Sequence, residues 1–239
     1  DNIPAAVAAW PSNPILEHDH VGPIPRANVS IKISSLFART DPMNHAGSID
    51  GLVEALKPIL ERAAERDVLV NFDMEHYALK DLTLDLFERC CETVDFTAGL
   101  AMQAYLRSGD EDAARVIRWA RDTGRQFTVR LVKGAYWDAE TIEAEMHGWP
   151  VPVWSRKRDT DASFERMTAA FIDAIPTSTN EGGIKLALEG NHREFEDSVH
   201  TKLTPGTSSV LVWAPPDEEI VVWLRPTNLS DWLTDEVDA

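Results

Sequence analysis

The segment Phe127–Asp138, which reads FTVRLVKGAYWD, contains the residue types best suited to chemistry in this chain. Its first six residues are mostly apolar and favour β-structure, so they predict a buried strand. Small residues after a strand let a flat ligand lie against the backbone, and cations attract an anion. The segment therefore predicts a site for a planar, anionic cofactor beside a small substrate; the simpler interpretation is a strand end with a solvated lysine and a packed tryptophan. The residues concerned are Arg130, Lys133, Gly134, Ala135, Tyr136 and Trp137.

Strand and helix patterns alternate on both sides of this segment. Strands are predicted at Val29–Ser34, Val68–Asp73, Phe96–Tyr105, Phe127–Val132 and Ile184–Leu188. Helical spacing of apolar residues predicts helices at Ser48–Arg66, Leu79–Thr93, Asp110–Thr123, Ala139–Met146, Asp161–Ile175 and Arg193–His200. Because strands that are apolar throughout and separated by helices form parallel sheets, we expect a parallel sheet with helices outside it.

Polar residues fall late in the predicted strands or just beyond them, at Asp73, Gln103, Lys133 and Asn191. In β/α barrels the active site lies at this carboxyl edge. A doubly wound sheet follows a similar rule, but it usually has a glycine-rich first turn, and none follows the first predicted strand. We therefore expect an α/β fold, a partial (β/α)8 TIM-type barrel with about five βα units present and strands six to eight missing or replaced.

The patterns divide the chain into three regions. Residues 1–27 are rich in proline and asparagine and are predicted to form an entry arm or linker. Residues 28–200 carry the incomplete barrel. Residues 201–239 break the β/α rhythm and hold two basic and seven acidic residues, with three of the eight tryptophans. We expect this last region to be a divergent acidic tail. The loss of strands six to eight leaves an apolar parallel edge, and whether the tail folds back to cover that edge is left open by the sequence.

Composition narrows the classes of function. The net charge of −17 argues against nucleic-acid binding, which needs a cationic face. No apolar run of about 18 residues and no charged-then-apolar leader occur, so we expect neither a membrane span nor secretion. The only cysteines, Cys90 and Cys91, are adjacent, which suits neither a structural disulfide nor a metal site. These features predict a cytoplasmic protein without a bound metal.

Six motifs occur in one order along the chain: VSIKISSL, NFDMEHY, GLAMQAYL, VRLVKGAYWD, WPVPVWSRKRDTDASFER and IKLAL. Together they closely resemble proline dehydrogenase, and most of all the proline dehydrogenase domain of the bifunctional PutA-type flavoenzymes, over roughly residues 28–192. The resemblance implies an FAD-containing β/α barrel that oxidises L-proline to Δ1-pyrroline-5-carboxylate by hydride transfer to the flavin. It further implies that electrons pass to a membrane quinone, and hence a peripheral association with the membrane.

The resemblance also implies a set of cofactor-binding residues. Arg130 would lie near the reactive edge of the flavin ring, and Gln103 would hydrogen-bond the ring. The remaining implied contacts are Lys133, Gly134, Ala135 and Trp137 along the ring and its tail, Ser155, Lys157 and Thr160 at phosphate or ribose, and Asn191 and His192 on the adenosine side. Asn191 and His192 stand in the reverse of the family's order. Taken alone, the run from Ser155 to Asp161 also suits a solvated helix start.

For the substrate, the resemblance implies Lys32 against the proline carboxylate, Asp73 in the polar wall of the pocket and Tyr136 against the pyrrolidine ring. Without the resemblance, Lys32 is equally well an edge-strand lysine that faces solvent. The neighbouring residues 75–77 are expected to support the site rather than to act as acids or bases.

The arginine pair that clamps the substrate carboxylate in the family has no counterpart in residues 200–239, where Arg225 stands alone. We therefore expect the isolated chain to bind FAD poorly and to turn over little proline.

The alternative is a non-catalytic truncated fragment, or one half of a split enzyme that needs a partner chain to complete the barrel. An aldolase-like enzyme with Lys133 as a Schiff-base lysine is a third hypothesis, which the lack of a nearby general acid disfavours.

Overall fold

The computed structural model describes residues 2–12, 17–19, 22–176, 178, 180–190, 209–213 and 220–225. The chain divides into two compact units. The first unit comprises Asp1–Glu17, Ile24–Met102 and Tyr136–Pro152, and the second comprises His18–Pro23, Gln103–Ala135 and Val153–Ala239. Each unit is described by itself below.

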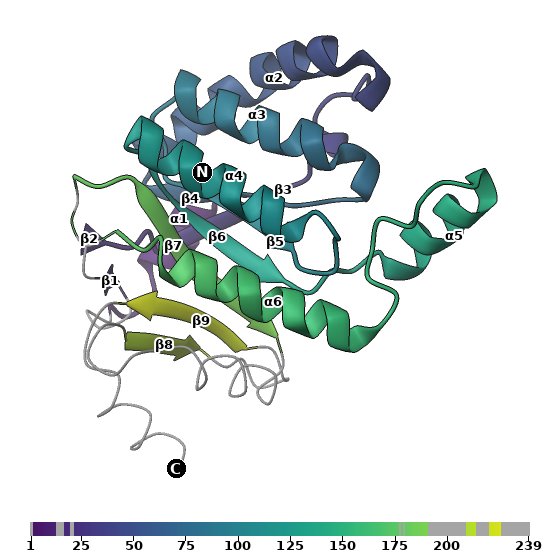
Figure 1. The fold of residues 1–239 in the computed structure, drawn as a ribbon. Helices are drawn as coiled ribbons and strands as arrows, with labels where there is room; N and C mark the ends of the chain where they lie inside the picture. The colour runs from purple at the N-terminus through teal and green to yellow at the C-terminus, as the bar shows by residue number, and fades with distance from the viewer. Residues whose placement is uncertain are drawn as a thin grey trace. The chain divides into compact units, whose positions relative to one another are not determined.

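The first unit is built on parallel strands covered by helices. Strands β3 (Ala27–Ile31), β4 (Val68–Phe72) and β5 (Ala98–Gln103) pair in parallel, with Ile31 opposite Phe72 and Val70 opposite Ala98. Helices α2 (His45–Glu65) and α3 (Lys80–Thr93) pack against each other, as the ribbon in Figure 1 shows. Helix α1 (Asn2–Ala8), helix α5 (Trp137–His147) and three short 3-10 helices complete the unit: η1 (Ile33–Ser35), η2 (Pro42–Asn44) and η3 (Tyr77–Leu79).

Leucine and phenylalanine side chains from these elements form the core of the first unit. Every residue of β4 and β5 is buried, which explains why these strands read as continuous apolar runs. Phe72 and Phe87 meet edge to face with their ring centroids 5.5 Å apart. Burial, together with the charge of Cys91, raises the pKa of Cys90 to about 12, so this thiol packs as an apolar group at neutral pH. The helix residues of the core include Leu52, Leu56, Leu60, Leu82 and Leu86.

Helix α2 continues through Pro58, although an interior proline usually breaks a helix. Pro58 lies on the exposed side of the helix, between the exposed residues Lys57 and Ile59. The carbonyl that loses its hydrogen-bond partner can therefore reach water, while Leu56 and Leu60 stay buried on the opposite side. The free energy gained by burying the leucine face of α2 outweighs the cost of the hydrogen bond that Pro58 removes.

In the second unit, β6 (Gln126–Val132) pairs in parallel with β7 (Gly183–Gly190), with Phe127 opposite Ile184. Helices α4 (Gly109–Thr123) and α6 (Lys157–Ile172) pack against each other and contact β7. An ion pair of 2.9 Å between Arg166 Nε and Asp110 Oδ2 joins the two helices at the surface. The core of this unit includes Val116, Ala120, Val129, Leu131, Phe164, Met167, Phe171 and Leu186.

Two further strands extend the sheet of the second unit beyond β7. Strand β9 (Ile220–Arg225) runs antiparallel to β7, and β8 (Ser209–Trp213) runs antiparallel to β9. Strand β9 therefore occupies the edge of β7, a point that the sequence left undecided. An unpaired strand edge exposes a row of N–H and C=O groups, and the antiparallel partner satisfies them. The direction of β9 also differs from the parallel strand that would continue a β/α barrel.

The strand and helix predictions between residues 29 and 188 are confirmed in type and differ at their ends. Strand β3 ends at Ile31 rather than at Ser34, because the chain turns into η1. Helix α5 begins at Trp137 and α6 at Lys157, two and four residues earlier than predicted. The arm at residues 1–27 contains α1 and a small antiparallel pair, β1 (His18–Asp19) and β2 (Gly22–Pro23). The helix predicted at Arg193–His200 lies outside the described residues.

No helix within the described ranges is long and apolar enough to span a membrane. Across the same residues, no cluster of three His, Cys, Asp or Glu side chains is arranged to hold a metal ion.

The packing of α2 gives a direct test of this core. We expect Leu56→Ala to lower the free energy of unfolding by roughly 2–5 kcal/mol, because it leaves a cavity beneath the helix. Ile59→Ala is the matched control, since Ile59 lies three residues away on the same helix and is 44% exposed. Urea unfolding followed by circular dichroism measures both. Equal losses for the two variants would contradict the assigned buried face.

Candidate active site

The predicted site residues form two groups, one in each unit. The group predicted to bind a cofactor lies mainly at the ends of β5 and β6 and at the start of α6, in the second unit. The group predicted to bind a substrate lies after β3 and β4 and at the start of α5, in the first unit.

The chain beyond β5 is hydrogen-bonded to the chain beyond β6. Ala104 N donates to Val132 O and Tyr105 N donates to Lys133 O, each at 2.8 Å. This pairing places Gln103, which is buried, beside the carboxyl end of β6. Arg130 is half-buried within β6. The structure thus brings an amide and two cations of the predicted cofactor set to one strand edge.

Gly134 is explained by its neighbour Tyr105 rather than by a ligand. Its φ of +128° lies in the region that favours glycine, and a Cβ there would come within 2.5 Å of Tyr105 Cγ. The tyrosine ring fills the side-chain face of Gly134, so the expectation that a flat ligand lies against the backbone here stays a prediction for the other faces of the segment. Tyr105 was missed as a site residue by sequence reasoning; its only signal was an aromatic residue at the end of the predicted strand Phe96–Tyr105. The adjacent Ala135 is exposed.

Asp161 connects two of the predicted cations. Its Oδ1 accepts a hydrogen bond of 2.6 Å from Lys133 Nζ, and Lys157 Nζ lies 3.1 Å from its Oδ2. The Lys133 ammonium also lies 5.8 Å from the centre of the Phe164 ring. Lys133 is thus an ion-paired cation, which argues against its service as a Schiff-base nucleophile. Asp161 was missed as a site residue, although its i,i+4 spacing from Lys157 was a usable signal.

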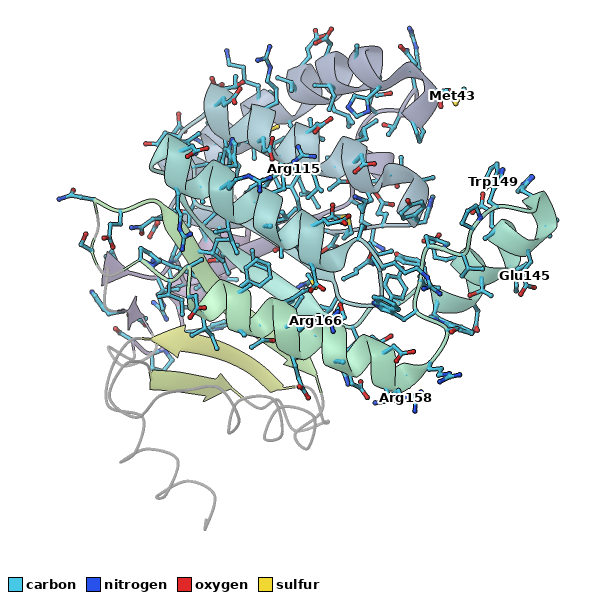
Figure 2. The ribbon with its side chains drawn as sticks, in the orientation of Figure 1. Met43, Arg115, Glu145, Trp149, Arg158 and Arg166 are labelled. Carbon is cyan, nitrogen blue, oxygen red and sulfur yellow. The ribbon has the colours of Figure 1, made fainter. Side chains whose placement is uncertain are left out.

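The N-terminus of α6 carries an unusual concentration of positive charge. Arg156 is its N-cap residue, and Lys157 and Arg158 begin its first turn; Figure 2 shows Arg158 at this end of the helix. A helix N-terminus is itself the positive end of the helix dipole, so cations there are unfavourable unless anions lie close by. Asp159 Oδ1 lies 3.7 Å from Arg158 Nε and Asp161 pairs with Lys157, so the three cations exceed the carboxylates of residues 156–161 by one charge. This donor set fits the phosphate groups of a nucleotide cofactor. Ser155 beside it is exposed, whereas Thr160 is buried.

In the first unit, Asp73 and Lys32 lie at the ends of neighbouring strands. Asp73 N donates to Ile31 O at 2.9 Å, which continues the pairing of β4 with β3. Asp73 Oδ1 accepts a hydrogen bond of 3.1 Å from Asn71 Nδ2. Lys32 lies one residue beyond β3 and is exposed, so it reaches solvent from the strand end rather than from within the strand.

Tyr136 is the N-cap residue of α5, and its ring meets the His76 ring nearly at right angles, with centroids 6.1 Å apart. Trp137 is the first residue of α5 and is 39% exposed. One turn further, Glu140 is buried and accepts a hydrogen bond of 2.6 Å from Tyr77 N. Tyr136 therefore lies against the segment that carries Asp73. The remaining predicted pair, Asn191 and His192, lies outside the described residues.

A cavity of about 340 Å³ in the first unit lies elsewhere, between α1, α2, β3 and β4. Its lining is apolar except for Arg62 and Arg66, and it includes none of the predicted site residues.

Comparison with known proteins assigns the family. A family model described as proline dehydrogenase matches residues 2–191 of the 239 residues. The chain belongs to the proline dehydrogenase family. The bifunctional protein PutA of Rhizobium meliloti is 36% identical over 148 residues. Proline dehydrogenase 1 of Bacillus subtilis (strain 168) is 33% identical over 112 residues.

A solved structure supports the fold. The crystal structure of PutA from Bdellovibrio bacteriovorus inactivated by N-propargylglycine matches 82% of this chain with a TM-score of 0.75 and 35% sequence identity. The prediction of a partial β/α barrel is therefore confirmed. The chain spans 12% of the Rhizobium relative, 32% of the Bacillus relative and 20% of the Bdellovibrio structure.

The contact between Gly134 and Tyr105 predicts a specific loss of stability. We expect Gly134→Ala to lower the free energy of unfolding by roughly 2–4 kcal/mol, since the methyl group is strained at this φ and overlaps the ring. Gly148→Ala is the control, because Gly148 also has a positive φ, of +64°, but has nothing within 4 Å of a Cβ. We expect a loss of only about 1–2 kcal/mol there. Equal losses in thermal unfolding would show that the ring contact contributes nothing.

Burial raises the pKa of Glu140 above its usual value of 4.5, with Glu143 adding to the effect and the Tyr77 N–H and His76 opposing it. The folded chain therefore holds this proton more tightly than the unfolded chain. The contribution of Glu140 to stability is fullest at low pH and declines as the pH rises from 4.5 through the raised pKa. We expect Glu140→Gln to gain stability relative to the wild type between about pH 5 and about pH 7.5. Urea unfolding at both pH values measures the free energy of unfolding of each protein. A difference between Glu140→Gln and the wild type that does not change with pH would contradict the prediction.

Proposed function

We propose that this chain carries the flavin-binding and proline-binding residues of an FAD-dependent proline dehydrogenase. The reaction is the oxidation of L-proline to Δ1-pyrroline-5-carboxylate. The family match over residues 2–191 carries this proposal. The cations at the end of β6 and at the start of α6 support it, because FAD combines a planar ring with a pyrophosphate.

FAD supplies the redox chemistry, by accepting a hydride from the substrate carbon, so the protein needs mainly to position the reactants. Gln103 would hydrogen-bond the flavin ring, and Arg130 would place positive charge at the ring edge. Lys133 would lie along the cofactor, held in place by Asp161. The pyrophosphate would bind at the N-terminus of α6, where Lys157 and the backbone N–H groups offer positive charge. Further proposed cofactor contacts are Gly134, Ala135, Trp137, Ser155, Thr160, Asn191 and His192.

In the first unit, the proposed substrate contacts are Lys32, Asp73 and Tyr136. Lys32 is exposed and can bind the proline carboxylate as a point charge. Asp73 offers a carboxylate to the secondary amine, and Tyr136 offers an aromatic face to the pyrrolidine ring. This set recognises the two charged groups and the apolar ring of L-proline at once.

The same family assignment leads us to propose a membrane quinone as the electron acceptor. A cytoplasmic chain that associates peripherally with the membrane would be able to pass electrons to such a quinone. As a second arrangement, a partner chain that supplies further barrel strands would make this chain one half of a split proline dehydrogenase. Dye reduction by the FAD-loaded chain with L-proline, alone and with the remaining barrel segment of the Bdellovibrio relative, distinguishes the two arrangements.

Arg130 provides the sharpest test of cofactor binding. Titration of the full chain with FAD, followed by quenching of flavin fluorescence, measures the affinity. We expect Arg130→Met to weaken FAD binding by about tenfold or more, the value of one or two charged hydrogen bonds. Arg118→Met is the control, because Arg118 is an exposed arginine on α4 of the same unit. The same titration tests whether the isolated chain binds FAD weakly. Absence of any FAD binding, or equal effects of both substitutions, would overturn the proposal.

A further inference from the structure

Two buried carboxylates hold the segment that follows β4. This segment, Asp73–Tyr77, is called the β4 loop here. Glu75 within it is only 6% exposed, and both of its oxygens are used. Oε1 accepts a hydrogen bond of 3.0 Å from Ser34 N, and Oε2 accepts one of 2.6 Å from Ser34 Oγ. Glu75 thus ties the β4 loop to the turn that follows β3.

The second carboxylate belongs to α5. Glu140 is 4% exposed, and its Oε1 accepts a hydrogen bond of 2.6 Å from Tyr77 N at the far end of the β4 loop. Glu140 N in turn donates to Tyr136 O at 2.9 Å, so Glu140 and Tyr136 share the first turn of α5. Glu140 therefore ties the β4 loop to the beginning of α5.

These two contacts join the three segments that carry the proposed substrate contacts. Lys32 lies two residues before Ser34, Asp73 lies two residues before Glu75, and Tyr136 lies one turn before Glu140. All of these residues belong to the first unit. A displacement of any one segment relative to the β4 loop would therefore alter the distance between two substrate-binding side chains.

Burial of a carboxylate is costly unless hydrogen bonds compensate for lost water, and packing alone would be served better by apolar residues. Both glutamates instead accept from backbone N–H groups of the short 3-10 helices η1 and η3, which lie outside the strand pairing. Neither can act directly on a substrate, since each is almost fully buried and its hydrogen-bonded oxygens face the protein. The hydrogen bonds of Glu75 and Glu140 instead hold the β4 loop against the turn after β3 and against the start of α5.

We propose that Glu75 and Glu140 are positioning residues that hold Lys32, Asp73 and Tyr136 in the arrangement that binds a small amino-acid substrate. The inference rests on the proposed function for the identity of that substrate, L-proline. The hydrogen bonds of Glu75 to Ser34 and of Glu140 to Tyr77, called the clamp here, form without any substrate.

Amide hydrogen exchange of the full chain, measured by NMR, tests the clamp without substrate. We expect Glu140→Ala to speed exchange of the Tyr77 amide by about tenfold or more, and Glu75→Ala to do the same for Ser34, because each amide loses its acceptor. Glu140→Gln keeps an acceptor oxygen and should restore slow exchange at Tyr77. Asp112→Asn is the control, because Asp112 is a buried carboxylate that accepts from Ser108 Oγ at 2.7 Å in the second unit.

Calorimetric titration of the FAD-loaded full chain with L-proline tests the positioning role. We expect Glu140→Ala and Glu75→Ala to raise the Kd by about tenfold or more, Glu140→Gln to recover most of the affinity, and Asp112→Asn to leave it unchanged. Ser34→Ala removes one hydroxyl, whose hydrogen bond to Glu75 is partly buried, and keeps the Ser34 N–H donor, so it provides a mild variant if an alanine at position 75 or 140 prevents folding. We expect it to raise the Kd by about threefold.

The outcomes separate the two proposals. Faster exchange with an unchanged Kd for L-proline overturns the positioning role, and so does unchanged exchange in the alanine variants. If the wild-type chain does not bind L-proline, the proposed function fails. The clamp is then decided by exchange alone, where faster exchange at Ser34 and Tyr77 sustains it and unchanged exchange refutes it.

Discussion

Parallel pairing of buried strands determines where polar chemistry can lie in this chain. Parallel strands within a unit end at a common edge, and their interiors are covered on both faces by apolar packing. Most charged side chains of the candidate site therefore lie just beyond the strand ends, with the half-buried Arg130 inside β6 as the exception. Asp73 follows β4 directly, Lys32 follows β3, and Lys133 follows β6. Both groups of the candidate site depend on this single constraint.

Charge is used locally in a way that the net charge of −17 conceals. Asp161 accepts from two lysines, and Glu75 and Glu140 accept from backbone N–H groups of the short 3-10 helices η1 and η3. Acidic residues therefore organise the segments that carry the cationic and aromatic side chains. The N-terminus of α6 keeps an excess of positive charge within this acidic chain, which is the electrostatic condition for binding a phosphate.

Sequence patterns predicted the elements well because burial follows them directly. Segments of five to seven mostly apolar or small residues became β4, β5 and β6, and the helical spacing of Leu52, Leu56 and Leu60 became the buried face of α2. The ends of elements were predicted less well. They depend on single turns such as η1, which ends β3 early and leaves Lys32 outside the strand. The motifs also identified the family before any contact was known.

By itself, the sequence determined the order of strands and helices, the family, and the types of residue available for binding, since these are properties of local pattern and motif. Tertiary structure decided which of those residues meet. The Tyr105 ring fills the side-chain face of Gly134, and Asp161, which the sequence indicated only as part of a helix start, pairs with Lys133. Glu75 was expected to support the site, but its partner Ser34 was not predictable, and Glu140 carries no signal of its role, because the two partners lie 41 and 63 residues away in the chain. Contacts between distant segments arise only when the strands align those segments, and no local pattern records them.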